Sequence, residues 1–120
     1  MTTAVGVDGC KLGWFYFRKD SDTYTYGVAA KLDQLTRQLP LGSRIFIDIP
    51  IGLIDSGTQG RECDRAARRV LGPTKASSVF PAPAHATLKA ESWEEACASN
   101  FRATTKKISK QTFAIIPKIR

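Results

Sequence analysis

The sequence predicts an α/β fold, in which an antiparallel meander and one parallel strand form a mixed sheet with helices. Three β-prone segments lie between residues 3 and 30 and are separated only by short turns, as in a meander. A fourth apolar segment, residues 45–49, follows a short helical pattern. Because a helix between two strands forms a right-handed crossover, we expect this segment to lie parallel to the first strand.

The first predicted strand is Thr3–Asp8. Val5 and Val7 occupy alternate positions in it, which is the period of a strand that is buried on one face. Because Asp8-Gly9 is a frequent hairpin dipeptide, we expect the chain to turn there, with Asp8 at the C-terminal tip of the strand. The next two predicted strands are Gly13–Lys19 and Thr23–Ala30.

A short helix is predicted next, with Asp33 as its N-cap and Leu35 on its buried face, before Pro40 ends it. The strand Ile45–Ile49 then has apolar residues at both alternating sets of positions, except for Asp48. This pattern is typical of a strand that is covered on both faces.

In this arrangement Asp8 and Asp48 follow two parallel neighbouring strands, so their carboxylates are expected at the same end of the sheet, one strand spacing or about 5 Å apart. Two such acids can share a divalent cation. The structural alternatives are a turn-capping role for Asp8 beside Gly9 and a buried, hydrogen-bonded role for Asp48. The second alternative is costly, since an ionised carboxylate inside an apolar strand needs a partner or a metal.

The second half of the chain is predicted to be helical around a proline-rich loop. A helix is expected over Arg61–Leu71, closed by Gly72, and residues 73–85 are expected to be extended and irregular. A capping box starts another helix at Ser92, and a last helix starts near Ser109. The residues expected to be buried on the Ser92 helix are Trp93, Ala96, Cys97 and Phe101. Those of the last helix are Phe113 and Ile116, and Pro117 is expected to kink or end it.

Composition indicates one domain over residues 1–120, since 42% of the 120 residues are apolar. No stretch is long and apolar enough to span a membrane and no signal-peptide pattern opens the chain, so we expect a cytoplasmic protein without membrane contact. Three cysteines without CxxC spacing and a single histidine favour neither a disulfide framework nor a zinc site. We expect reduced, mostly buried thiols.

The net charge of +7 favours nucleic acid as a partner about as strongly as it favours a plain solubility role. Basic residues are concentrated in residues 61–69 and 102–110, whereas three glutamates group between residues 91 and 95. This separation of basic from acidic residues slightly favours the interpretation of a binding face.

Five motifs resemble an uncharacterised bacterial family of predicted nucleases with the ribonuclease H-like fold. They are VGVDGCKLGW, IDIPIGL, RECDRAARRVLG, SSVFPAP and SKQTFAIIPKI, and together they extend over nearly all 120 residues. The resemblance implies a ribonuclease H-like sheet with metal-binding carboxylates at strand tips. Family members continue beyond the last motif, so we expect this chain to be a truncated, N-terminal portion of the family domain.

By motif, Asp8 and Asp48 occupy the positions of the two strand-tip acids, and they are therefore the candidate catalytic and metal-binding residues, with Mg²⁺ or Mn²⁺ as the ion. The candidate substrate-binding residues are Lys11, Arg61, Asp64 and Arg68. Asp64 and Arg68 are four residues apart on a helix, so a surface ion pair is the simpler account of those two, and Arg61 could join it. For Lys11, a solvated position in the turn is a simpler explanation than contact with a phosphate.

The leading hypothesis is a divalent-metal-dependent nuclease domain that hydrolyses phosphodiester bonds, weakly or not at all because it contains few acids. The alternative is a non-catalytic module that binds nucleic acid or another protein. Phosphoryl transfer on a nucleotide ranks lowest, since no Walker-type glycine loop is present. Truncation is also expected to expose the edge of strand Ile45–Ile49, which predicts a homo-oligomer, most simply a two-fold dimer.

Overall fold

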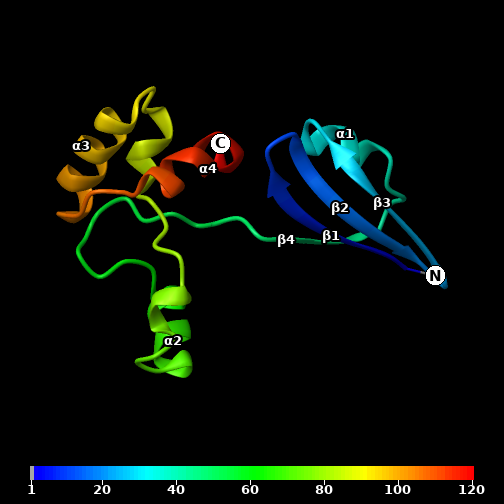
Figure 1. Cartoon of the computed structure of the whole chain (residues 1–120), viewed down its shortest axis with the longest axis horizontal. Coiled ribbons are helices and arrows are strands. Elements are labelled where there is room, and N and C mark those ends of the chain that lie inside the picture. Colours follow the sequence, from blue (N-terminus) through cyan, green and yellow to red (C-terminus); the bar gives the residue numbers. More distant parts are fainter. Residues whose placement is uncertain (1) are drawn as a thin grey trace. The chain divides into compact units, whose positions relative to one another are not determined.

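The computed structural model describes residues 2–120, and these divide into two compact units (Figure 1). The first unit ends at Ile49 and the second is Pro50–Arg120. Each unit has its own buried apolar cluster. Among the described residues, no helix has the length and apolar character needed to cross a membrane.

The first unit is a four-stranded mixed sheet. Its strands are β1 (Thr3–Cys10), β2 (Gly13–Asp20), β3 (Thr23–Ala29) and β4 (Arg44–Ile47), in the order β3-β2-β1-β4 (Figure 1). β2 is antiparallel to both of its neighbours, whereas β4 is parallel to β1. The predicted meander with one added parallel strand is therefore confirmed.

The first hairpin turns two residues later than predicted. Asp8 pairs with Phe15 inside the ladder, and pairing continues to Cys10 and Gly13. The prediction of a turn at Asp8-Gly9 is therefore wrong. The longer ladder brings Trp14 into the core, where it is 6% exposed. Gly13 has a φ of 134°, and a Cβ there would lie 2.3 Å from the carbonyl oxygen of Ala29, so only glycine fits this position.

One face of the sheet packs against α1 (Leu32–Arg37). The buried cluster there consists of Val5, Val7, Trp14 and Leu35. Leu35 is buried as predicted, but the N-cap of the helix is Lys31 and not Asp33, which lies in the first turn. The Lys31 N–H donates to the side-chain oxygen of Gln34, so this side chain provides a hydrogen-bond acceptor for an N–H at the start of the helix.

The opposite face of the sheet is exposed and aromatic. Phe15 and Phe17 of β2 lie in register with Asp8 and Gly6 of β1, and Phe46 of β4 is also in register with Gly6. Phe46 is 65% exposed, so the expectation that both faces of its strand are covered is wrong. The reason is that β4 is an edge strand and α1 packs on the other face. The exposed aromatic residues are Phe15, Phe17, Tyr24, Tyr26 and Phe46.

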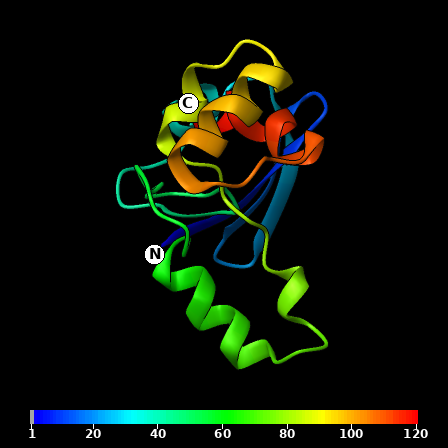
Figure 2. The ribbon, with the colours of Figure 1, turned by 90° about the vertical axis from the view of Figure 1, so that its left-hand side faces the viewer.

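The second unit is helical, with α2 (Glu62–Leu71), α3 (Trp93–Thr104) and α4 (Lys110–Ile119). Two short 3₁₀ turns, η1 (Ala76–Ser78) and η2 (His85–Lys89), interrupt the proline-rich segment, which is otherwise irregular as predicted. Its core is formed by α3, α4 and the segments that flank them; the buried residues are Ala90, Ala96, Cys97, Ile108 and Ile116. Figure 2 shows η2, α3 and α4 grouped together, with α2 standing apart from them.

The predicted capping residue Ser92 is confirmed, and the last helix starts at Ser109 as expected. The Ser92 side chain accepts a hydrogen bond from the Glu95 N–H at 3.1 Å, and Ser109 accepts one from the Thr112 N–H at 3.0 Å. The second bond of the predicted capping box differs, because the Glu95 carboxylate accepts from the N–H of Glu91. Local hydrogen bonding is enough to fix these helix starts.

The boundaries of α2 agree with the prediction, and none of its residues is buried. Three expectations about the second unit are wrong. Phe101 of α3 is 52% exposed, and Cys63 is an exposed thiol. α4 continues through Pro117, since this residue lies in the last turn and loses only one helical hydrogen bond there. Burial of Ile116 and the bond from the Arg120 N–H to its carbonyl oxygen at 3.2 Å keep the last turn helical.

Candidate functional site

Asp8 and Asp48 lie next to one another in the sheet. The parallel register pairs Val7 of β1 with Ile47 of β4, and Asp8 and Asp48 are the residues that follow. The Asp48 N–H donates to the carbonyl oxygen of Val7 at 3.3 Å, so the two chains stay adjacent at this point. Both acids line one open depression on the aromatic face of the sheet.

Both carboxylates are exposed to solvent. Asp48 is therefore not the buried acid that the apolar pattern of its strand suggested, and it does not need a metal to offset a burial cost. Its exposure has a different consequence, because an exposed carboxylate next to a second one is accessible to a dissolved cation. The pair repels itself when both groups are ionised, and a bound cation relieves that repulsion.

The donor set suits a hard divalent cation. Mg²⁺ is usually held by one or two carboxylates, several waters and the phosphate of a substrate, and Asp8 with Asp48 matches that pattern. Within residues 2–120, no group of three or more His, Cys, Asp or Glu side chains is placed to hold a metal. Such a cation would be held weakly and would leave most of its coordination positions open.

Sequence reasoning missed the phenylalanines around the two acids. Phe15, Phe17 and Phe46 line the same depression as Asp8 and Asp48. The signal was present in the alternation of β2, where Phe15 and Phe17 fall on the opposite face from the buried Trp14. This alternation does not identify the exposed face, because the sequence of one strand does not show which of its two faces is covered.

The basic residues of α2 form a second arrangement. Arg61 donates from Nε and from one terminal nitrogen to the two oxygens of Asp64, at 2.8 and 2.7 Å, and from its other terminal nitrogen to the carbonyl oxygen of Ile51 at 2.9 Å. The hydrogen bonds that Arg61 donates to Asp64 raise the pKa of the Arg61 guanidinium, against the effect of partial burial. The expected ion pair between Asp64 and Arg68 is wrong, since Arg68 donates instead to the carbonyl oxygen of Val79 at 3.2 Å.

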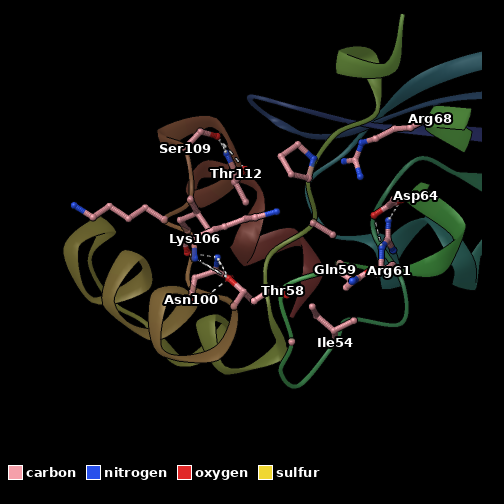
Figure 3. A pocket seen from close by; sticks show the side chains of 17 residues that line it. Ile54, Thr58, Gln59, Arg61, Asp64, Arg68, Asn100, Lys106, Ser109 and Thr112 are labelled. Carbon is pink, nitrogen blue, oxygen red and sulfur yellow. Dashed lines mark hydrogen bonds and ion pairs between the residues drawn. The ribbon is translucent and has the colours of Figure 1, made fainter. Parts of the chain in front are cut away.

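These three side chains line a pocket of about 130 Å³. Figure 3 shows Arg61 and Asp64 joined on one side of it, below Arg68, with Asn100, Ser109 and Thr112 on the other side. Lys106 and Lys107 also line the pocket. The structure therefore brings Arg61, Asp64 and Arg68 together, as the sequence suggested. The fourth substrate-binding candidate, Lys11, is exposed in the turn between β1 and β2 of the first unit.

Asn100 holds one wall of the pocket in place, and sequence reasoning did not identify this residue. The side chain is 5% exposed. Its oxygen accepts from the Ala84 N–H at 2.8 Å, and its nitrogen donates to the Lys106 carbonyl oxygen at 2.7 Å and to the Thr104 hydroxyl at 3.1 Å. One buried amide thus joins the proline-rich segment, α3 and the loop before α4.

Comparison with known proteins gives one match. The family model described as "Protein of unknown function (DUF429)" matches residues 6–120, which is nearly the whole chain. No curated protein and no solved structure matches the chain.

Proposed function

We propose, from the premise that this chain belongs to the DUF429 family, that it is a ribonuclease H-like nuclease domain that hydrolyses phosphodiester bonds with the help of Mg²⁺ or Mn²⁺. The observation that supports the proposal is the parallel register of β1 and β4, which makes Asp8 and Asp48 neighbours on an open face. Oxygen ligands in this arrangement suit hard divalent ions.

Each part of the depression has a role in this proposal. Asp8 and Asp48 hold the cation, which when bound polarises a phosphoryl oxygen and stabilises the charge that develops on it. Phe15, Phe17 and Phe46 offer ring faces on which unpaired bases stack beside the acids. Because only two carboxylates are present, we expect weak metal binding and slow cleavage.

A Mn²⁺ titration followed by calorimetry tests the proposal directly, together with cleavage assays on single-stranded, duplex and hybrid nucleic acids. We expect weak, saturable Mn²⁺ binding that is lost in the double variant Asp8→Asn/Asp48→Asn. Cleavage should require the divalent ion and stop on addition of a chelator. Mn²⁺ binding of equal strength in the double variant contradicts the assignment of the site.

The exposed aromatic face favours a second candidate function, binding of single-stranded nucleic acid without catalysis. Phe15 and Tyr26 have ring centroids 6.5 Å apart, and those of Phe17 and Tyr24 are 5.6 Å apart, so the rings form two adjacent pairs. Sheets with exposed aromatic residues are a common platform for unpaired bases. Lys19, with its amino group 5.7 Å from the Tyr24 ring centroid, adds positive charge.

We expect Phe17→Ala to weaken binding of single-stranded oligonucleotides by roughly five- to tenfold, since stacking of one base contributes about 1–3 kcal/mol. The matched control is Phe101→Ala, because Phe101 is similarly exposed, at 52% against 47%, and lies on α3. Fluorescence anisotropy at fixed salt measures both. An equal effect of the two substitutions counts against the aromatic face as the binding surface.

We further propose that the chain forms a homo-oligomer through the free edge of β4. Within the described residues, β4 pairs only with β1, and Ile45 and Phe46 are exposed on it. Ile45→Lys should shift the protein to a monomer in light scattering, because a charge on an edge strand opposes strand pairing. Leu41→Lys is the control, since Leu41 is fully exposed in the preceding loop. A wild-type protein that is already monomeric at high concentration overturns the proposal.

A further inference from the structure

We propose that the pocket of the second unit binds a phosphate monoester group, with the 5′-phosphate of a nucleotide or oligonucleotide as its source. The proposal goes beyond the proposed nuclease activity and does not depend on Asp8 or Asp48, which lie in the first unit. The first observation behind it is the positive charge of the second unit. Residues 50–120 contain 12 Lys and Arg against 6 Asp and Glu, a net charge of +6 out of the +7 of the whole chain.

The charge is concentrated at the pocket. Its lining includes four basic residues, Arg61, Arg68, Lys106 and Lys107, and a single acid, Asp64. The pairing of Asp64 with Arg61 neutralises two of these five charges. Three cations remain without an acidic partner among the residues that line the pocket, and this excess attracts a dianion.

The two arginines are held in position and still have donors to offer. A guanidinium has five N–H donors, and Arg61 uses three of them in its bonds to Asp64 and the Ile51 carbonyl oxygen. Arg68 uses one, on the carbonyl oxygen of Val79. A guanidinium that is already oriented loses little freedom when it binds, and its forked donors match two oxygens of a phosphate.

The opposite side of the pocket adds neutral donors. Ser109, the N-cap of α4, and Thr112 in its first turn both line it, so the N-terminal end of that helix lies at the pocket. The Ser109 hydroxyl accepts from the Thr112 N–H, but the N–H groups of the two residues between them have no partner within the helix, and the helix dipole favours an anion there. Thr58 adds a hydroxyl from the loop before α2. These groups complement the cations of α2.

The size of the pocket limits the ligand. A volume of about 130 Å³ is well below the roughly 300–1,000 Å³ of pockets that enclose drug-sized molecules. The pocket therefore encloses a single tetrahedral oxyanion and leaves the rest of a nucleotide outside. A terminal phosphate fits this description better than an internal phosphodiester, since it presents three oxygens and a higher charge to the surrounding donors.

Calorimetric titration with inorganic phosphate tests the pocket by itself. We expect Arg68→Gln to weaken phosphate binding by about tenfold or more, because a hydrogen bond between charged groups contributes at least the 1.4 kcal/mol that corresponds to a factor of ten. Arg69→Gln is the matched control, since Arg69 is the next residue of α2, is exposed and does not line the pocket. Equal loss in both variants indicates a general charge effect and overturns the proposal.

Because Arg68→Gln also removes the bond to the Val79 carbonyl oxygen, it could lower phosphate binding by disturbing the fold. A second variant separates these two effects. Lys106→Gln/Lys107→Gln changes two exposed side chains and should leave the circular dichroism spectrum and thermal midpoint unchanged while weakening phosphate binding by at least about fivefold. A control with matched charge is Lys75→Gln/Arg69→Gln, whose residues are exposed and lie away from the lining. Unchanged affinity in the Lys106/Lys107 variant contradicts a pocket that relies on these cations.

The source of the phosphate is tested with two short single strands that differ only in a 5′-phosphate or a 5′-hydroxyl. We expect the phosphorylated strand to bind at least about fivefold more tightly, and this preference to disappear in Arg68→Gln. Loss of the preference in the Asp8→Asn/Asp48→Asn variant instead would place the phosphate at the acids and overturn the proposal. Tight binding of inorganic phosphate without any preference between the strands overturns the nucleic-acid end as the source.

Discussion

Asp48→Asn is expected to lower metal-dependent cleavage by at least about 100-fold, to the background of the assay. The substitution removes one of the two carboxylates that are proposed to hold the cation, and even loss of an outer-shell partner costs roughly 10–100-fold at metal sites. Folding should be unaffected, because the Asp48 side chain is exposed and its backbone bond to Val7 is retained. Asp8→Asn should have the same effect, since the proposal assigns one cation to both acids.

The control for this prediction is Asp22→Asn, which changes the charge equally at an exposed position in the turn between β2 and β3. Cleavage rates with Mn²⁺, measured with enzyme in excess over substrate, allow slow turnover to be quantified. If Asp48→Asn retains the activity of Asp22→Asn, the cleavage does not come from this site. The aromatic face would then remain as a surface that binds nucleic acid without catalysis.

The second large effect is expected on stability. Asn100→Ala should lower the free energy of unfolding of the second unit by about 3 kcal/mol, since it leaves the Ala84 N–H and the Lys106 carbonyl oxygen without this partner inside the protein. A buried polar group that loses its hydrogen bond costs roughly 1–3 kcal/mol. Because the amide joins three segments, the substitution should also loosen the wall of the pocket.

Urea denaturation followed by circular dichroism measures this change. Gln111→Ala is the control, because Gln111 is exposed on α4, and its effect should stay within about 0.5 kcal/mol. Asn100→Asp should be at least as destabilising as Asn100→Ala, since it keeps an oxygen for the Ala84 N–H but places a buried carboxylate against the carbonyl oxygen of Lys106. An Asn100→Ala protein as stable as the Gln111→Ala control would show that the network contributes little.

Local chemistry explains which features of the fold were predictable. The period of Val5 and Val7 identified the first strand, and the capping pattern that begins at Ser92 identified a helix start. Each of these signals depends on neighbours within a few residues, so it can be read from the chain alone. The adjacency of β1 and β4 was also predictable, because the handedness of a crossover limits where a fourth strand can lie.

Competing local signals explain the errors. Asp8-Gly9 is a strong turn dipeptide, yet two further residue pairs formed because they bring Trp14 into the core. Spacing on α2 suggested a pair between Asp64 and Arg68, but a bidentate bond to Arg61, which precedes the helix, was the better geometry. In each case the structure that formed contains a contact that the local pattern did not predict. How much such a contact stabilises the fold depends on where the residues lie in three dimensions.

The sequence by itself determined the order and type of the main elements, the parallel neighbour of β1, and the nearness of Asp8, which lies close to the end of β1, to Asp48, which follows β4. Periodicity, capping and crossover handedness are local or topological rules. Only the tertiary structure decided which sheet face stays exposed and where Asn100 finds its three partners. It also decided that Arg61, Arg68 and Lys106 line one pocket. These features depend on contacts between residues far apart in the chain, and no spacing rule within one segment specifies such contacts.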